Sequence, residues 1–421
     1  MQPLANRALL QRPRATITSS SVVCRSCRRR RLATTAAPPK PPAAGLAELS
    51  SRRVLAVAGA DATKFLQGIV TQNVATANSG RNITTAPPEP RTEGFYAGFL
   101  NATGRVMHDT FIYPFRSGAG GLSALDYGDG GDGFLVEADA SQAARLEKYI
   151  KRYKLRAKVS VRVLAPEEVS VWQAWDDAAS NPGLPSGNGS IMTLRDPRAP
   201  AMGWRILQLG PGTPDVIDAE RAAEDAYTIR RYLQGVPEGQ DELLREQALP
   251  LESNMEHMGG VDFHKGCYVG QELTIRTRHR GVVRKRVLPC ALYDADRPAP
   301  SVLAYDPDAL PAGSGTTDAA AVPTETSIGR CGKSGRSAGK WLKGLGNVGL
   351  ALCRLEIMTD VAAVVPGGGD QVPAAATYSP EDDFVLDWGG DDDVGGSVKI
   401  KAFVPDWLRA SMEEAQRKKK Q

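Results

Sequence analysis

The sequence lacks long apolar segments and contains few cysteines. No stretch of 18 or more apolar residues occurs in the 421 residues, so no transmembrane helix is predicted. Six cysteines in a chain of this length do not make a disulfide framework. Cys24 and Cys27 form a single C-x2-C pair that is surrounded by arginines and has no second pair nearby. We therefore do not interpret this pair as a zinc site.

Acidic residues are absent from the first 47 positions, and the first one is Glu48. This segment holds eight arginines and Lys40, with serines and threonines between them. Such a composition is typical of a mitochondrial transit peptide, and a disordered nucleic-acid-binding arm is the alternative. The whole chain has a formal charge of +4, to which residues 1–47 contribute +9, so the remainder carries −5. The basic pI therefore does not predict a nucleic-acid partner.

A complete phosphate-binding loop is also missing. Gly332-Lys333-Ser334 is similar to the end of such a loop, but Ser327 occupies the position of its first glycine. The surrounding glycine- and serine-rich composition indicates a flexible loop instead.

Residues 48–290 have the pattern of a mixed α/β region. Residues 41–47 are rich in proline and alanine and are predicted to be a linker. The apolar patterns predict strands at 54–57, 95–114 (two strands around a turn at 101–104), 159–163 and 273–287. Amphipathic periodicity predicts helices at 143–153 and 219–233.

Residues 291–408 have the pattern of a small β domain. Strand-like segments lie at 348–355 and 398–404. Residues 294–347 and 366–397 have few large apolar side chains, which predicts two disordered insertions. Residues 409–421 are predicted to be a basic tail.

The segment from Phe263 to Leu273 is the most informative part of the chain. Cys267 lies between Gly266 and Gly270 and follows Lys265 closely. A nearby ammonium group favours the thiolate form of a cysteine, so Cys267 and Lys265 are candidates for cluster-linked or redox chemistry. The alternative is a glycine-bounded turn that holds a buried, inert cysteine.

This segment, Lys-Gly-Cys-Tyr-Val-Gly-Gln-Glu, resembles the signature of the YgfZ-type iron–sulfur cluster assembly factors. These proteins are folate-binding relatives of the glycine-cleavage T protein, an aminomethyltransferase. Further blocks that resemble the family lie at 65–71, 100–106, 153–159, 196–198, 203–205, 235–239 and 249–252. Together with the presequence, the resemblance indicates the mitochondrial branch, located in the matrix.

The resemblance implies an α+β fold in which three domains form a ring. Two mixed α/β domains and a C-terminal small β-barrel would surround a central folate-binding hole. It further implies tetrahydrofolate or a related reduced folate as ligand and A-type iron–sulfur carrier proteins as partners. No nucleic-acid or membrane partner is expected. Cys267 by itself cannot hold a cluster, because clusters usually need four ligands, so it would share a transient cluster with a partner.

The resemblance also indicates folate-binding residues. Glu252 lies in a Leu-Pro-Leu-Glu block, and its carboxylate could accept two N–H bonds from a pterin. An N-cap or an exposed acid is the alternative for Glu252. Asp109 stands where the aminomethyltransferases carry catalytic acids, although His108 precedes it here, and a structural role is the equal alternative for Asp109. Arg156, in a basic cluster, is a candidate for binding an anionic folate.

These residues leave three functions open. The first is an assembly factor that binds tetrahydrofolate and assists maturation of [4Fe–4S] proteins through Cys267. The second is a folate-dependent one-carbon transferase, of aminomethyl or methyl groups, with Asp109 as base. The third is an RNA-binding protein that uses the basic clusters at 148–158 and 276–286. The cysteine motif and the loss of paired acids favour the first.

Overall fold

The computed structural model describes residues 37–75, 91–115, 132–178, 190–215, 219–310, 318–332, 335–361, 378–389 and 395–420. The predicted transit peptide lies almost wholly outside the described residues. Residues 37–421 form one compact unit, and the description below concerns this unit.

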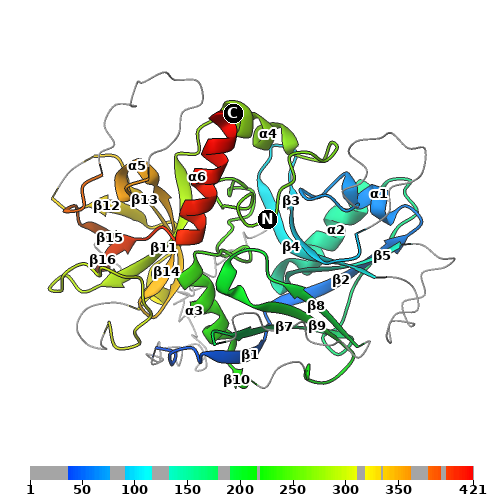
Figure 1. Ribbon diagram of the computed structural model, residues 1–421, viewed down its shortest axis with the longest axis horizontal. Helices are drawn as coiled ribbons and strands as arrows, with labels where there is room; N and C mark the ends of the chain where they lie inside the picture. The colour runs from blue at the N-terminus through cyan, green and yellow to red at the C-terminus, as the bar shows by residue number, and fades with distance from the viewer. Residues whose placement is uncertain are drawn as a thin grey trace, which may run out of the picture. The chain divides into compact units, whose positions relative to one another are not determined.

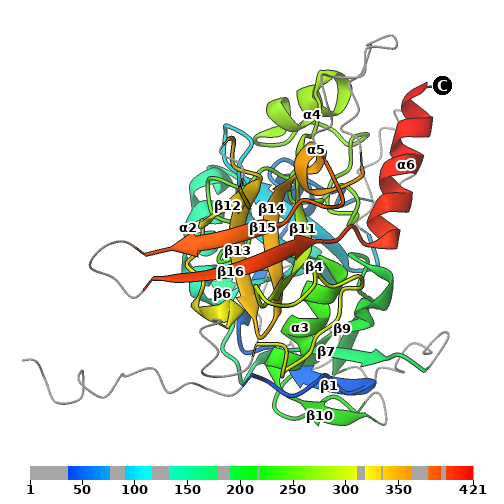
Figure 2. The same cartoon turned by 90° about the vertical axis from the view of Figure 1, so that its left-hand side faces the viewer.

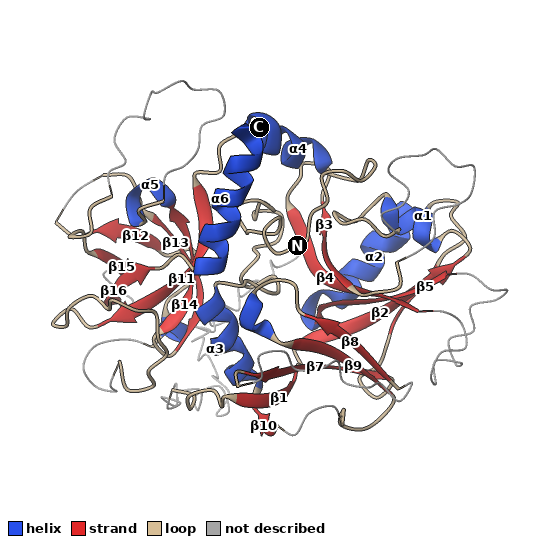
Figure 3. Cartoon of the chain, in the orientation of Figure 1, coloured by secondary structure: helices blue, strands red, loops and turns tan. Residues whose placement is uncertain are grey.

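The first of two five-stranded sheets is antiparallel, and helices α1 and α2 cover one of its faces (Figures 1 and 3). Its strand order is β3-β4-β5-β2-β6. The bounds are β2 Arg52–Gly59, α1 Ala62–Gln67, β3 Phe95–Leu100, β4 Val106–Phe115, β5 Asp132–Asp139, α2 Ala143–Lys154 and β6 Ser160–Val163. The strands and the helix predicted within 48–163 are thereby confirmed.

The second sheet begins inside the segment predicted to be a linker. Its strand order is β10-β1-β7-β9-β8, in which β1 and β10 are parallel. The bounds are β1 Ala44–Glu48, β7 Val169–Asp176, β8 Ile191–Arg195, β9 Trp204–Leu209 and β10 Glu220–Ala222. The linker prediction is wrong because the small residues of β1 are there for packing. A Cβ on Gly45 would lie 2.3 Å from the Trp175 ring.

Helix α3, Glu224–Gln234, follows β10 directly. The prediction of a helix from residue 219 is therefore correct in type and begins too early, because residues 220–222 pair with β1. Gly235 ends the helix in the left-handed conformation.

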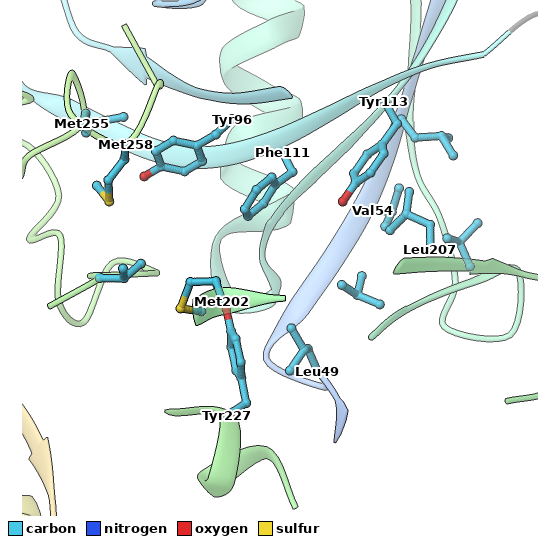
Figure 4. Packing of buried hydrophobic residues seen from close by; sticks show 14 of the residues in the cluster. Leu49, Val54, Tyr96, Phe111, Tyr113, Met202, Leu207, Tyr227, Met255 and Met258 are labelled. Carbon is cyan, nitrogen blue, oxygen red and sulfur yellow. The ribbon is translucent and has the colours of Figure 1, made fainter. Parts of the chain in front are cut away.

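The two sheets face each other across a hydrophobic core to which both contribute (Figure 4). Strand β2 contributes side chains to two hydrophobic cores, one on each face of its sheet. Val54 and Ala56 belong to the core between the sheets, whereas Leu55 and Val57 pack under α1 and α2. Successive side chains of a strand point to opposite faces, so a strand buried on both faces reads as a continuous apolar run.

A closed six-stranded barrel follows (Figure 2). Its strand order is β11-β14-β13-β12-β15-β16. The bounds are β11 Lys285–Tyr293, β12 Ser327–Arg330, β13 Gly339–Leu345, β14 Val348–Arg354, β15 Phe384–Trp388 and β16 Gly396–Ala402. The α+β class and the C-terminal barrel are confirmed, and the barrel begins at Lys285 instead of residue 291.

The two ranges predicted to be disordered insertions contain three barrel strands. Strands β12 and β13 lie within 294–347, and β15 lies within 366–397. The composition was misleading because small residues can pack against a large buried side chain, here Trp341. Cβ atoms on Gly344 and Gly349 would lie 2.5 and 2.4 Å from its ring, so these glycines serve packing. Residues 311–317, 333–334, 362–377 and 390–394 lie outside the described residues.

Three further helices complete the described chain: α4 Gln271–Arg280, α5 Leu355–Met358 and α6 Asp406–Lys420. The predicted basic tail is thus the continuation of α6. Leu408 and Met412 of this helix pack into the barrel core. The strand predicted at 273–287 is wrong for its first half, which is α4, and correct from Lys285 onwards.

Candidate functional site

Cys267 is exposed on the loop that precedes α4. Gly266 beside it is also exposed, whereas the next residue, Tyr268, is buried. The Val269 amide donates to the Gly68 carbonyl at 3.1 Å, which joins the loop to the end of α1. Cys267 is therefore not the buried cysteine of the alternative: the thiol is presented to solvent from an anchored loop.

Lys265 fastens the same loop. Its Nζ donates to the carbonyl oxygens of Gln67, Val70 and Gln72 at 2.7, 2.6 and 3.0 Å. Burial lowers the pKa of this ammonium group to about 7, against the opposite effect of Asp262. The predicted role of Lys265 was to place positive charge beside the thiol. In the structure its charge is directed into the turn after α1.

Gly270 is the N-cap residue of α4, and its backbone conformation determines the path of the loop before this helix. Its φ of +81° is in the left-handed region, and a Cβ there would lie 2.3 Å from the Asn101 carbonyl oxygen. Gly104, with φ +82°, approaches Gly270 from the turn between β3 and β4. Gln271 then closes the turn, because its Oε1 accepts a hydrogen bond from the Tyr268 amide at 3.2 Å. Helix α4 buries only Thr274, so it has no apolar stripe from which it could have been predicted.

Asp109 is fully buried on β4. Its Oδ2 accepts a hydrogen bond from Arg52 Nη1 at 3.3 Å. Its Oδ1 accepts bonds from the Gly239 amide at 3.1 Å and from Gln240 Nε2 at 3.3 Å. All of these partners hold the carboxylate in place, so the geometry favours the structural alternative over a catalytic base.

Asp109 belongs to a buried network of charges that sequence reasoning missed. Glu238 accepts hydrogen bonds from Arg198 at 2.7 Å, from the Tyr227 hydroxyl at 2.7 Å and from Arg205. Arg52 Nε donates to Glu137 at 2.8 Å. Arg198, Arg205 and Glu238 lie in blocks that carry the family resemblance, which was a usable signal. Nothing in the sequence showed that these charges would be buried together.

Glu252 and Arg156 lie on separate elements. Glu252 Oε1 is 3.4 Å from Lys285 Nζ at the start of the barrel, and one fifth of the Glu252 side chain is exposed. Arg156 is exposed in the turn between α2 and β6. Within the described residues, no hydrogen bond or ion pair joins any two of Asp109, Glu252 and Arg156. Asp109, Glu252 and Arg156 thus come from three different parts of the fold, and their roles in folate binding stay predictions.

A cavity of about 650 Å³ lies between the edge strands of the two sheets, β3 and β8. Aromatic residues in its wall are Phe95, Tyr96, Tyr113 and Trp204, and charged ones are Arg91, Glu93 and Arg195. Tyr96 is fully buried, and its hydroxyl has no hydrogen-bond partner among the described residues. Pockets of this size, with apolar walls and a few polar groups, are typical of small-molecule sites.

Comparison with known proteins identifies the family. A protein of Pyricularia oryzae named "Iron-sulfur cluster assembly factor IBA57 homolog, mitochondrial" is 53% identical over 418 residues, which cover 97% of each chain. A protein of the same name from Chaetomium globosum is 47% identical and covers 96% of this chain and 93% of its own. The chain belongs to the IBA57 family of mitochondrial iron–sulfur cluster assembly factors. The family resemblance and the mitochondrial location predicted from the sequence are thereby confirmed.

Two further likenesses concern the fold. The family model described as "CAF17, C-terminal beta-barrel domain" matches residues 284–410, which contain the six barrel strands. The crystal structure of glycine cleavage system aminomethyltransferase T from Bartonella henselae superposes with a TM-score of 0.51 at 11% identity, over 86% of each chain. At this identity the likeness shows the fold alone. It places this IBA57 family member in the architecture that the signature motif predicted.

Proposed function

We propose that this IBA57 family member assists maturation of [4Fe–4S] proteins by presenting Cys267 to a cluster that an A-type carrier protein holds. The observation that carries this proposal is the exposure of Cys267 on a loop that is fastened on both sides. Lys265 and Gly270 fix the backbone next to the thiol, so a partner would meet one defined position. Since a cluster usually has four ligands, the carrier would supply the others.

Replacing Cys267 tests this proposal. Cys267→Ser removes the thiolate and changes the side-chain volume little, so the fold should persist while mitochondrial [4Fe–4S] enzymes lose most of their activity. Cys331→Ser is the matched control, since Cys331 is the other thiol that the described residues leave partly exposed. Full [4Fe–4S] enzyme activity in cells that contain only Cys267→Ser would contradict the proposal.

We further propose that a reduced folate binds in the cavity between β3 and β8. The residues present fit such a ligand: the aromatic walls suit a flat pterin ring, and Glu93 offers a carboxylate acceptor for its N–H groups. Arg91 and Arg195 suit the anionic glutamate tail. A reduced folate would supply a one-carbon carrier or a reducing pterin at this place. Glu252 remains a second candidate for gripping the pterin.

Calorimetry with tetrahydrofolate distinguishes the two folate positions. Glu93→Gln should weaken binding by about 10- to 100-fold, the usual loss for a charge-assisted hydrogen bond. Glu147→Gln on the surface of α2 is the control and should bind like the wild type. If Glu252→Gln loses affinity and Glu93→Gln does not, folate binds at the Glu252–Lys285 pair instead. Unchanged affinity in both variants would contradict both positions.

The one-carbon transferase alternative gains no support from the site. It needs a carboxylate base at Asp109, and this carboxylate is buried and engaged by Arg52, Gly239 and Gln240.

A further inference from the structure

The turn between α2 and β6 presents a leucine to solvent in an unusual backbone conformation. Leu155 is 87% exposed. Its φ is 43° and its ψ is −107°. The Ala157 amide donates to the Lys154 carbonyl at 2.8 Å, so Leu155 is the second residue of a tight turn, in a conformation that normally requires glycine. A bulky residue with positive φ is strained, and such strain points to a function of the side chain.

Basic residues precede and follow this leucine in the sequence. Arg145, Lys148, Lys151 and Arg152 are exposed on α2. Residues three and four apart share one face of a helix, so these four lie on the side of α2 that faces away from the sheet. The chain from residue 145 to residue 158 contains seven basic residues and one acid, Glu147. That acid pairs with Lys151 at 2.9 Å.

The turn is firmly held, so the leucine is not part of a frayed end. The Lys158 amide donates to Asp61 Oδ2 at 2.7 Å, and the Asp61 amide donates to the Lys158 carbonyl at 3.4 Å. Tyr149 anchors α2 from below, because its hydroxyl donates to the Leu100 carbonyl at 2.8 Å. These hydrogen bonds thus hold in place the turn and the helix that carry Leu155 and the basic residues beside it in the sequence.

We propose that this basic surface, Arg145, Lys148, Lys151, Arg152, Leu155, Arg156 and Lys158, docks on an anionic lipid bilayer. Leu155 would enter the interface between head groups and acyl chains, and the basic side chains would contact lipid phosphates. No described helix is long and apolar enough to cross a membrane, so the contact is peripheral. This differs from the sequence-based expectation that no membrane takes part.

The observations favour a bilayer over the other polyanion, nucleic acid. Single-stranded nucleic acid is bound by aromatic side chains on which the bases stack. The nearest aromatic residue, Tyr153, packs against the Tyr149 ring at 4.7 Å. An exposed aliphatic side chain contributes nothing to phosphate binding, whereas it contributes directly to burial in a bilayer. Arg156, a candidate for folate binding from the sequence, contacts lipid in this proposal.

Vesicle flotation of the full chain tests the proposal. The probes are phosphatidylcholine vesicles with and without phosphatidylglycerol. The wild type should bind only the anionic vesicles, and high salt should release it. Leu155→Asn should weaken binding about tenfold through loss of apolar burial. The melting temperature of this variant should be equal or higher, because asparagine accepts a positive φ more readily than leucine. The triple variant Lys148→Gln, Lys151→Gln and Arg152→Gln should weaken binding about 100-fold.

Two controls make the result specific. Val302→Asn removes the other large apolar side chain that is exposed among the described residues; it is 71% exposed, lies after β11, and the variant should bind normally. Arg276→Gln with Arg280→Gln removes charge from α4 and should also bind normally. Because the basic first 47 residues could bind lipid themselves, hydrogen exchange should localise the contact. Anionic vesicles should protect amides at 148–158 and leave those at 276–284 unchanged.

Three outcomes would overturn the proposal. The first is equal binding to neutral and anionic vesicles. The second is unchanged affinity in both the Leu155 and the triple variant. The third is binding of a polyribonucleotide that depends on the basic residues and not on Leu155, without any binding to vesicles.

Discussion

Cys267 and Lys265, both in the signature motif, have different structural roles. Cys267 is exposed and keeps its thiol available to a partner. Lys265 donates all three of its hydrogen bonds to carbonyl oxygens of the turn after α1. The motif therefore combines one residue that faces outward with one that fastens the loop. Substituting Lys265 should affect stability, whereas substituting Cys267 should affect maturation of [4Fe–4S] proteins.

The lowered pKa of Lys265 gives a pH-dependent prediction. The folded pKa of about 7 is below the ordinary value of 10.5, so between these two values the unfolded chain binds more protons than the folded chain. Relative to Lys265→Met, the free energy of unfolding of the wild type should therefore rise by up to about 1.4 kcal/mol per pH unit in this window. Urea unfolding at several pH values measures the difference. Parallel curves for the two proteins would show that Lys265 keeps an ordinary pKa.

At the scale of elements, the signature loop and the β3–β4 turn are joined by two glycines. Gly270 and Gly104 face each other so closely that a Cβ on either would meet the backbone of the opposite element. Both have positive φ angles. The position of Cys267 thus depends on a contact between residues that are far apart in the sequence.

Gly270→Ala tests this contact. The substitution combines an unfavourable left-handed conformation with a 2.3 Å approach to the Asn101 oxygen. It should lower the free energy of unfolding by about 2–4 kcal/mol, measured as a shift of the urea midpoint. Gly266→Ala is the matched control in the same loop, because nothing lies within 4 Å of its Cβ position. If both variants lose the same free energy of unfolding, the loss is caused by any substitution in this loop and not by the contact between Gly270 and Gly104.

At the scale of the whole folded unit, a network of buried charges joins the two sheets. Arg52 and Glu137 come from the first sheet, Arg205 comes from the second, and Glu238 follows α3. Burial by itself would raise the pKa of Glu238, but four guanidinium groups, that of Arg205 foremost, hold it well below 4.5. Removing one partner would leave several buried charges without compensation.

Glu238→Gln should therefore lower the free energy of unfolding at neutral pH by about 3–5 kcal/mol. The control is Asp360→Asn, which breaks an exposed pair with Arg409 and should cost at most about 1 kcal/mol. Since the folded pKa of Glu238 is depressed, its contribution is present above about pH 4.5 and is lost as the pH falls through the folded pKa. The difference between wild type and Glu238→Gln should thus shrink in acid. A constant difference across acid pH would contradict a charged Glu238.

The sequence by itself determined the elements whose pattern is local. Helix α2, strands β2 to β4 and the turn between β3 and β4 follow from apolar periodicity and turn residues, which act over a few positions. The signature around Cys267 was also sufficient to indicate the family. Local patterns failed where a residue's role depends on a distant partner. The small residues of β1 looked like a linker because the Trp175 ring that Gly45 accommodates lies far away in the sequence.

Tertiary structure alone decided which charged and polar residues are buried, and what they face. For Asp109 the sequence left a catalytic and a structural role equally open, and only the structure shows that Arg52 and Gly239 reach its carboxylate from other elements. Lys265 was expected to place its positive charge beside the thiol. In the structure its ammonium group donates hydrogen bonds to carbonyl oxygens of the turn after α1. Leu155, which no sequence pattern singled out, is exposed in the turn after α2. Side-chain burial and charge pairing depend on contacts between distant segments, and one sequence does not specify those contacts in any local pattern.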